Sequence, residues 1–488
     1  MRFRTTLIFV LVLLGLAAYV YWVEVPQSRE EAKKKTVFEF NPDDVTEVSL
    51  GYADRQMVVK RTGADWRLTQ PVDAAADATA IRNMITAIAE AEVKKTFENV
   101  SDLGPYGLDQ PFVKVTITVK DKELPSILVG KATPVGYSAY VKKSNEQTVL
   151  LTTAAFRAGM DKQAKDLRDK TIVNFADPDV QRVEIAGDGK EVALVQADTR
   201  WTIERPASFA ADAATMRSFL SALRALRAVD FAADTPTDLS AFGLDKPRLT
   251  VRLYLGKDKA EKDILIGKEN ENKQLYVKGS GQPTVYLVSD WVLRDLDKTT
   301  NDFRDKTLLV FDRDKLTTVD VTRRDGARFT LVRANQEWRV EGVGDGKPSQ
   351  TAISQYLGDL RDLVGFEIVA DDPANLAPFG LDQPLLKVRL VGEADHPVGT
   401  ILLGTRAGDA GANEYTAMTE GGRTVFRIRD YQFTRLDKQP QDFSERPTPA
   451  SALAPEAGMP DAADEGFEGE PLGDDFGGVP DEPAAQEQ

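Results

Sequence analysis

Residues 107–111 read Gly-Leu-Asp-Gln-Pro, and the same Gly-Leu-Asp-x-Pro element returns twice further along the chain. The three copies are Gly107, Leu108, Asp109 and Pro111; Gly243, Leu244, Asp245 and Pro247; and Gly380, Leu381, Asp382 and Pro384. Other residues keep the same spacing, namely Trp66, Trp201 and Trp338, and Gly130, Gly267 and Gly404. A module of roughly 136 residues is therefore repeated three times in tandem. Features present in every copy are predicted to serve the fold, and function is expected in what the copies do not share.

Each module is predicted to be an α+β domain with an antiparallel-rich sheet and two helices. Alternating apolar residues at 45–48, 56–60 and 66–68 indicate three opening strands in the first copy, with counterparts in the other two. A helix follows in each copy, because apolar residues recur at i, i+3, i+4 and i+7. The stripes are Ile81, Met84, Ile85 and Ile88; Met216, Phe219, Leu220 and Leu223; and Ile353, Tyr356, Leu357 and Leu360. The expected N-caps are Asp77, Asp212 and Ser349.

More strands are predicted after the Gly-Leu-Asp-x-Pro element, at residues 113–119, 249–255 and 385–391. The next strand is predicted to end at the recurring glycine of each copy. A tyrosine then recurs on a further strand, and it is interpreted as an equivalent core position rather than a ligand platform. These tyrosines are Tyr140, Tyr276 and Tyr415. A second helix is predicted to begin near Phe156, Trp291 and Tyr431.

The Gly-Leu-Asp-x-Pro element itself is interpreted as a turn. Glycine permits positive φ, aspartate can accept hydrogen bonds from nearby backbone N–H groups, and proline fixes φ where a strand begins. Three equivalent carboxylates could suggest catalysis, but no partner acid or base recurs beside them. The structural interpretation is favoured, and no catalytic, cofactor-binding or metal-binding residue is predicted.

Residues 5–23 form an uncharged run that is long enough to cross a bilayer, because nineteen residues give a helix of roughly 28 Å. Tyr19, Tyr21 and Trp22 cluster at its far end, where aromatic rings prefer the membrane–water interface. A retained anchor is favoured over a signal peptide cleaved near residues 15–17, since the apolar run continues beyond that point. The repeats are expected on the periplasmic, extracytoplasmic side of the cytoplasmic (inner) membrane.

The predicted organisation follows from these features. It comprises a cytoplasmic stub (1–4), a transmembrane anchor (5–23), a charged juxtamembrane linker (24–35), repeat domains at 36–170, 171–306 and 307–446, and a disordered acidic tail (447–488). No Gly/Ser/Pro-rich linker separates the repeats, so neighbouring domains are expected to pack against each other. The tail holds eleven acidic residues and no Lys or Arg, a composition typical of disordered segments.

Composition excludes several functional classes. The net charge is -15, but eleven of the negative charges lie in the tail, so the rest of the chain is almost balanced. No nucleic-acid partner is therefore predicted. The chain has no cysteine, which removes disulfides, thiolate metal sites and cysteine nucleophiles. His396 is the single histidine, and it is interpreted as a solvated turn residue beside Pro397.

Several of these features together resemble the bacterial domain-of-unknown-function family 4340. They are the N-terminal anchor, the Gly-Leu-Asp-x-Pro turn, Lys131-Ala132-Thr133-Pro134 with Tyr140 downstream, and the closing Phe303-Arg304-Asp305-Lys306. The third copy departs from the pattern at Thr405 and at Ser444-Glu445-Arg446. The resemblance implies a membrane-anchored protein, often encoded beside ABC-transporter permeases and gliding-motility-type auxiliary subunits. It supplies no catalytic residues.

Two functional hypotheses remain open. The leading hypothesis is a non-enzymatic, membrane-anchored envelope protein that serves as an auxiliary or scaffold subunit of an ABC-type transport or gliding-motility-type complex. Its expected partners are the lipid bilayer and an ABC permease or its auxiliary subunits. The alternative is an extracytoplasmic module that binds an envelope polysaccharide or peptide between domains. An enzyme is the least favoured class, because no unrepeated acid–base pair is evident.

Overall fold

The computed structural model describes residues 36–341, 347–406 and 414–445. The chain divides into two compact units, Met1–Thr307 and Leu308–Gln488, and each is described by itself. The predicted stub (1–4), anchor (5–23), linker (24–35) and acidic tail (447–488) lie outside the described residues. In the described ranges, no helix is both long and apolar enough to span a membrane.

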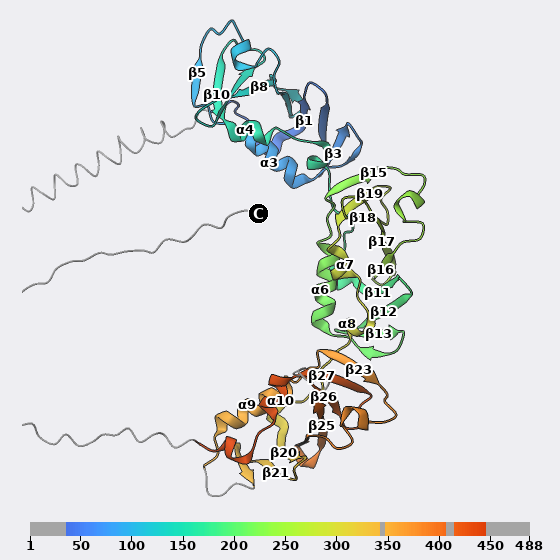
Figure 1. The fold of residues 1–488 in the computed structure, drawn as a ribbon. Helices are drawn as coiled ribbons and strands as arrows, with labels where there is room; N and C mark the ends of the chain where they lie inside the picture. The colour runs from blue at the N-terminus through green and yellow to red at the C-terminus, as the bar shows by residue number, and fades with distance from the viewer. Residues whose placement is uncertain (1–35, 342–346, 407–413, 446–488) are drawn as a thin grey trace, which may run out of the picture. The chain divides into compact units, whose positions relative to one another are not determined.

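The first repeat is built on an antiparallel sheet with ten described strands (Figure 1). The strands are β1 (Val45–Gly51), β2 (Gln56–Thr62), β3 (Asp65–Gln70), β4 (Ala74–Ala75), β5 (Lys95–Phe97), β6 (Val113–Val119), β7 (Lys122–Glu123), β8 (Ile127–Ala132), β9 (Ser138–Lys143) and β10 (Val149–Thr153). The helices and 3-10 turns are α3 (Ala78–Ala89), α4 (Ala154–Gly159), α5 (Ala164–Leu167), η2 (Pro42–Asp44) and η3 (Gly104–Tyr106). The sheet order is β4-β3-β2-β1-β6-β8-β9-β10-β5, with β7 paired to β6.

The second repeat has nine described strands in the same spatial order. They are β11 (Val180–Gly187), β12 (Lys190–Ala197), β13 (Arg200–Arg205), β14 (Phe209–Ala210), β15 (Asp230–Ala233), β16 (Leu249–Leu255), β17 (Ala260–Glu269), β18 (Gln274–Gly279) and β19 (Val285–Ser289). Its helices and 3-10 turns are α6 (Ala213–Arg224), α7 (Val292–Leu296), α8 (Thr300–Phe303), η4 (Asp177–Asp179) and η5 (Ser240–Phe242). The order is β14-β13-β12-β11-β16-β17-β18-β19-β15.

The third repeat forms the second unit and has eight described strands. They are β20 (Leu316–Arg323), β21 (Arg328–Ala334), β22 (Glu337–Glu341), β23 (Glu367–Asp371), β24 (Leu386–Gly392), β25 (Pro397–Arg406), β26 (Glu414–Thr419) and β27 (Thr424–Arg429). The helices and 3-10 turns are α9 (Gln350–Arg361), α10 (Asp430–Leu436), η6 (Arg313–Lys315), η7 (Ala377–Phe379), η8 (Glu393–Asp395) and η9 (Pro440–Phe443). The order β22-β21-β20-β24-β25-β26-β27-β23 matches that of the other repeats from β3 and β13 onward.

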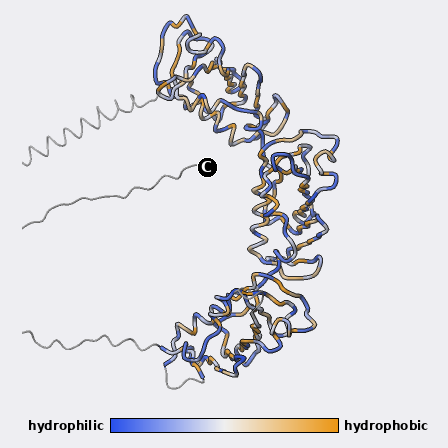
Figure 2. The backbone as a smooth tube through the Cα atoms, viewed as in Figure 1, coloured by the Kyte–Doolittle hydropathy of each residue, from blue (hydrophilic) through white to orange (hydrophobic). Residues whose placement is uncertain are grey.

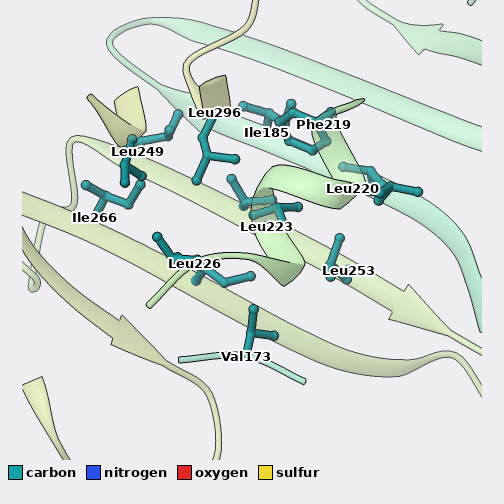
Figure 3. Close-up of a cluster of buried hydrophobic side chains, with 14 of the residues drawn as sticks. Val173, Ile185, Phe219, Leu220, Leu223, Leu226, Leu249, Leu253, Ile266 and Leu296 are labelled. Carbon is teal, nitrogen blue, oxygen red and sulfur yellow. The ribbon is translucent and has the colours of Figure 1, made fainter. Parts of the chain in front are cut away.

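The long helix of each repeat covers one face of its sheet. In the second repeat, Phe219, Leu220 and Leu223 of α6 pack against side chains from strands β11 and β16 (Figure 3). Figure 2 shows the alternation of hydrophobic and hydrophilic residues along the strands that creates this buried face. The predicted caps are present: the side chains of Asp77, Asp212 and Ser349 each accept a hydrogen bond from a backbone N–H in the first turn. The predicted α+β class, with antiparallel sheets, is confirmed.

The prediction of two helices per repeat is wrong for the first two repeats, which have a third helix, α5 or α8, of four residues. The third repeat has the 3-10 turn η9 at this position. An acid fixes each turn by accepting a hydrogen bond from the backbone N–H of the N-cap residue, from Gln163 to Asp166 and from Thr299 to Asp302. A single turn has no apolar period, so the pattern that reveals the longer helices does not reveal this one.

The sequence pattern also missed edge strands, including one that every repeat has. Strands β5, β15 and β23 come directly after the long helix and pair with the last strand of the sheet, on the far side from the opening hairpin. They place the loop that carries the Gly-Leu-Asp-x-Pro element beside strands that come much later in the chain.

Candidate functional site

The Gly-Leu-Asp-x-Pro element follows a 3-10 turn in each repeat, and its glycine ends that turn. Gly107, Gly243 and Gly380 all have left-handed backbone conformations, with φ of 64°, 66° and 65°. The following leucines are buried, with Leu108, Leu244 and Leu381 exposing 2%, 3% and 2% of their surface. Pro111, Pro247 and Pro384 then lead into strands β6, β16 and β24. The glycine and leucine of the element are therefore used by the fold.

The aspartates of the element do not play the predicted part in the turn. Asp109, Asp245 and Asp382 are exposed, and no described residue donates a hydrogen bond to their carboxylates. The turn is held instead by an Asp or Asn five residues before the glycine. Its side chain accepts a hydrogen bond from the backbone N–H of the residue two positions later. The distances are 3.0 Å from Gly104 to Asp102, 2.8 Å from Ser240 to Asp238 and 3.0 Å from Ala377 to Asn375. The signal was visible in the sequence, because an Asp or Asn recurs at this spacing in all three copies.

The second recurring glycine of each repeat lies inside a strand, so the prediction that the strand ends there is wrong. Gly130, Gly267 and Gly404 are within β8, β17 and β25. A Cβ atom at these positions would lie under 3.0 Å from the carbonyl oxygens of Tyr106, Phe242 and Phe379. Glycine is needed because the 3-10 turn rests directly on the strand backbone. The turn therefore packs on the sheet face opposite the long helix.

The predicted equivalence of the three tyrosines is wrong in the third repeat. Val129 pairs with Val141 and Ile266 with Val277, which places Tyr140 and Tyr276 at the same register. Leu403 pairs with Ala417, so Thr416 occupies that register and Tyr415 is one residue away. A shift of one residue turns a side chain to the other face of a strand. Tyr415 accordingly stacks on Phe433, with ring centroids 4.0 Å apart, beside the helix-covered core.

The junction between the first two repeats is stabilised by an arginine, Arg168, near the end of the first repeat. Arg168 is only 7% exposed, and its guanidinium carbon lies 3.7 Å from the centroid of the Phe231 ring in the second repeat. The same guanidinium forms an ion pair with Asp234, and Lys165 lies 3.1 Å from Asp230. Both pairs join side chains from different repeats, so Arg168 acts as a clamp within the first unit.

A cavity of about 430 Å³ lies at this junction, and we call it the junction cavity. Its walls come from both repeats and include Arg67, Arg168, Thr235, Gln282, Thr284 and Tyr286. The Tyr286 hydroxyl is hydrogen-bonded to the Gln282 side chain, and burial raises the pKa of Tyr286. The lining combines hydroxyl, amide, guanidinium and aromatic groups, which suits a neutral polar ligand better than an apolar one.

A larger cavity, of about 940 Å³, lies on the third repeat along helix α9, and we call it the third-repeat groove. Its charged lining consists of Arg313, Asp359, Arg361, Asp362, Arg435, Lys438 and Asp442. Arg361 lies 2.8 Å from Asp362, and Arg435 lies 3.5 Å from Asp359. The groove is therefore polar and rich in cations, and its arrangement is suited to recognising anionic groups.

Tyr356 lies at the base of the third-repeat groove. It is 2% exposed, and no described residue hydrogen-bonds with its hydroxyl. Burial raises the pKa of Tyr356 well above the usual range, and the nearby carboxylates of Asp437 and Asp359 raise it further. Its ring packs edge-to-face on Phe443, with centroids 5.3 Å apart. The phenol therefore stays neutral, and its ring contributes to the core.

The remaining predicted residues are either exposed or outside the described ranges. His396 is exposed at the turn between β24 and β25, where its backbone N–H donates to the Glu393 carbonyl oxygen. Within residues 36–341, 347–406 and 414–445, no group of three His, Asp or Glu side chains could hold a metal ion. Tyr19, Tyr21 and Trp22, predicted at the membrane interface, lie outside the described residues.

Three consecutive modules with one sheet order make the chain a tandem-repeat α+β protein. It belongs to the domain-of-unknown-function family DUF4340, whose model matches residues 66–240, 201–364 and 338–448. The resemblance inferred from the sequence is thus confirmed. Each match begins at the tryptophan of the third strand, Trp66, Trp201 or Trp338, and the first two extend into the following repeat. The family unit is therefore offset from the boundaries of the sheets.

Comparisons with other proteins add no functional assignment. No curated protein matches the chain. One solved structure with weak likeness is a DnaN sliding clamp (DNA polymerase III subunit beta) from Pseudomonas aeruginosa bound to griselimycin. It shares 8% sequence identity, covers 80% of this chain and 93% of its own, and has a TM-score of 0.09. A TM-score this low carries no argument about fold or function.

Proposed function

We propose that the chain is a non-enzymatic envelope protein, anchored in the membrane by residues 5–23, that serves as an auxiliary or scaffold subunit. The complex it serves is an ABC-type transport or gliding-motility-type assembly. The nature of that complex is suggested by the family resemblance, and the scaffold role is suggested by the repeats. Fold alone does not imply function, so each part of the proposal has its own test.

One observation carries the scaffold role: the elements shared by all three repeats are occupied with folding. The recurring leucines are buried, the recurring glycines make room for a 3-10 turn, and the recurring caps bind helix N-termini. Three copies of one fold present three surfaces, and equivalent surface positions differ in charge, as Asp177 and Arg313 do. Such an arrangement suits a protein that contacts several partners, or one partner at several places.

The proposed anchor makes a prediction about topology. Residues 5–23 would cross the cytoplasmic (inner) membrane, with Tyr19, Tyr21 and Trp22 at the outer interface and the repeats on the periplasmic side. The chain has no cysteine, so single cysteines can report accessibility cleanly. In intact cells, a membrane-impermeant maleimide should label S218C on the exposed face of α6 and leave F3C unlabelled. Labelling of F3C alone would reverse the proposed orientation.

The partner is tested by crosslinking in membranes, followed by mild-detergent purification and mass spectrometry. A photoreactive residue at Tyr137, which is 89% exposed at the β8–β9 hairpin, samples the first repeat. The same probe at Lys257, exposed on the β16–β17 hairpin, samples the second repeat. Recovery of ABC permease and ATPase subunits in fixed proportion is expected. Recovery of the protein alone from both positions would contradict the auxiliary role.

The junction cavity favours a second candidate function, a binding module for an envelope polysaccharide or peptide. Its walls come from two repeats, and about 430 Å³ accommodates a small sugar or a short peptide segment. Calorimetric titration with soluble envelope glycan fragments and short peptides tests this candidate. T235W should block binding, because Thr235 lines the cavity, whereas T237W on the same exposed loop should not. Equal binding by both variants would exclude the cavity as the site.

A further inference from the structure

The third-repeat groove carries charges that the second repeat lacks at equivalent positions. The 3-10 turns η4 and η6 begin at Asp177 and Arg313, and each leads directly into the first strand of its repeat. Asp177 lies 2.9 Å from Arg224, the last residue of α6, and the last residue of α9 is also an arginine, Arg361. The third repeat therefore has two arginines where the second repeat has an ion pair, and this place changes from neutral to positive.

A second position changes sign in the same groove. Leu296 and Leu436 are the buried last residues of α7 and α10. The residue before each leucine is exposed, and in the third repeat it lines the groove. That residue is Asp295 in the second repeat and Arg435 in the third. Two independent replacements of an acid by an arginine therefore fall in one groove.

Two cations in the third-repeat groove form no ion pair with a described carboxylate, although the pKa of Asp362 is lowered by the hydrogen bond from Arg361 and also by the charge of one of the two, Arg313. Arg361 and Arg435 pair with acids of α9 and its C-cap, and the Asp442 carboxylate accepts a hydrogen bond of 2.8 Å from the Gln439 backbone. Arg313 and Lys438 line the groove without such a pair. Their charges are available to an anionic group from elsewhere.

We propose that the third-repeat groove is the docking site for this chain's own acidic segment, residues 447–488. Ser444 lines the groove, so the segment follows directly from its rim. It carries eleven acidic residues and no Lys or Arg, and seven of the acids lie between Asp461 and Asp475. The eleven steps of chain from Glu445 to Glu456, the first acid of the segment, can span about 38 Å when extended, so the acids from Glu456 onward can reach the groove. This proposal is independent of the proposed scaffold function.

The physics favours docking within one molecule. Exposed ion pairs are individually weak and are screened by salt, so a separate acidic peptide would bind poorly. A covalently connected segment experiences an effective concentration in the millimolar range, which compensates for weak pairing. The docked segment would cover the cations of the groove and keep other anionic chains from them. Docking should weaken steeply as ionic strength rises.

Carbodiimide crosslinking of the full-length protein tests the proposal, because it joins a lysine amine to a carboxylate only where the two are in contact. At low salt, mass spectrometry should find Lys438 joined to Asp or Glu residues within 447–488. In a mixture of isotopically heavy and light protein, the two peptides of each join should carry the same isotope label, because both come from one molecule. Joins only between molecules, or no join to Lys438, would overturn the proposal.

R313D is the decisive variant, because it places in the third repeat the acid that the second repeat already has. The new acid can pair with Arg361, as Asp177 pairs with Arg224 in the second repeat. The variant should therefore keep the fold. The yield of the Lys438 join should fall about threefold or more, since two units of charge are changed in the same groove. K257D makes the same charge change on the β16–β17 hairpin and should leave the yield unaltered. Equal yields in wild type and R313D would overturn the proposal.

Discussion

The second and third repeats share a sheet order and a buried leucine after a left-handed glycine, but they differ at several equivalent positions. The differing pairs are Asp177 and Arg313, Asp295 and Arg435, Phe219 and Tyr356, and Tyr276 and Thr416. The shared positions are those where packing or backbone approach leaves no choice. Two of the differing pairs change the charge of a surface, and two change how a buried contact is made. The comparison shows that the fold constrains the glycines and leucines that hold the 3-10 turn on the sheet, while surface charges and some buried contacts differ between repeats.

The pair Tyr276 and Thr416 shows two solutions to one packing problem. Tyr276 packs edge-to-face on Phe242, the last residue of the 3-10 turn, with ring centroids 5.1 Å apart. Thr416 instead donates a hydrogen bond of 2.6 Å to the carbonyl oxygen of Phe379, the equivalent turn residue. Both side chains hold the turn against the sheet. An apolar contact in one repeat and a polar contact in the other thus give the same loop position.

The largest effect is expected where the two repeats agree, at the glycine inside the strand. G267A and G404A would each place a Cβ atom against a turn carbonyl, and the strain should cost about 3 kcal/mol in the affected repeat. Hydrogen exchange should increase in β16–β18 for G267A and in β24–β26 for G404A. G159A, at a position with nothing within 4 Å, is the control and should leave exchange unchanged. An effect that spreads equally to both repeats would contradict their independence as units.

The next effect concerns the end of the module, where the repeats diverge. Arg168 forms a β-bridge with Ala76 at the end of the first repeat and contacts Phe231 of the second. In the third repeat, Ser444 has the equivalent position and bridges to Pro348 of the same repeat. R168A should destabilise the junction by about 2 kcal/mol, because it removes the buried guanidinium of an ion pair and a cation–π contact. Limited proteolysis near residues 168–173 should accelerate. S444A should have little effect, and equal sensitivity of the two variants would refute the clamp.

Much of the fold could be predicted from local pattern. The long helices and their caps follow from apolar spacing and a capping side chain, and both signals are confined to about a dozen residues. The left-handed glycine and its buried leucine were likewise recognisable from repetition. The edge strands β5, β15 and β23 were missed because they are short and lie between a helix and a loop. Short strands carry too few alternations to stand out.

The candidate sites could not be predicted in the same way. Tyr415 was wrongly predicted to be equivalent to Tyr140 and Tyr276 because the chain between the glycine and the next strand differs in length among the copies. Register depends on that length, and an error of one residue reverses every side chain. The partners of Arg168 lie 63 and 66 residues further along the chain, so only the folded junction brings them together. The third-repeat groove likewise gathers side chains from η6, α9 and α10.

A smaller effect is expected from the buried hydroxyl that distinguishes α9 from α6. Phe219 and Tyr356 make the same edge-to-face contact, with Phe303 and Phe443 respectively, at 5.2 Å and 5.3 Å. Y356F should stabilise the third repeat by about 1 kcal/mol, because it removes a buried hydroxyl that no described residue pairs with. The reciprocal F219Y should destabilise the second repeat by a similar amount. Denaturant unfolding followed by hydrogen exchange in each repeat measures both, and destabilisation by Y356F would show that its hydroxyl is satisfied.

The smallest effect concerns acid stability and a carboxylate of the second repeat. Glu184 accepts hydrogen bonds from Arg182 at 2.9 Å, Arg205 at 2.7 Å and Tyr254 at 3.0 Å. Partial burial alone would raise the pKa of Glu184, but the hydrogen bonds from Arg182 and Tyr254, together with the charges of both arginines, lower it. The equivalent residue of the third repeat, Asp320, accepts a hydrogen bond from Thr330 instead.

The sign of the pH effect follows from that lowered pKa. A carboxylate whose pKa is lower in the folded state stabilises the fold above its unfolded pKa, and the contribution is lost as pH falls through the folded value. Between about pH 5 and about pH 3, wild type should lose roughly 1 kcal/mol that E184Q does not lose. Y254F should show part of the same change, because it removes one of the three donors. Parallel acid unfolding curves for wild type and E184Q would mean that the arginine contacts do not stabilise the ionised carboxylate in solution.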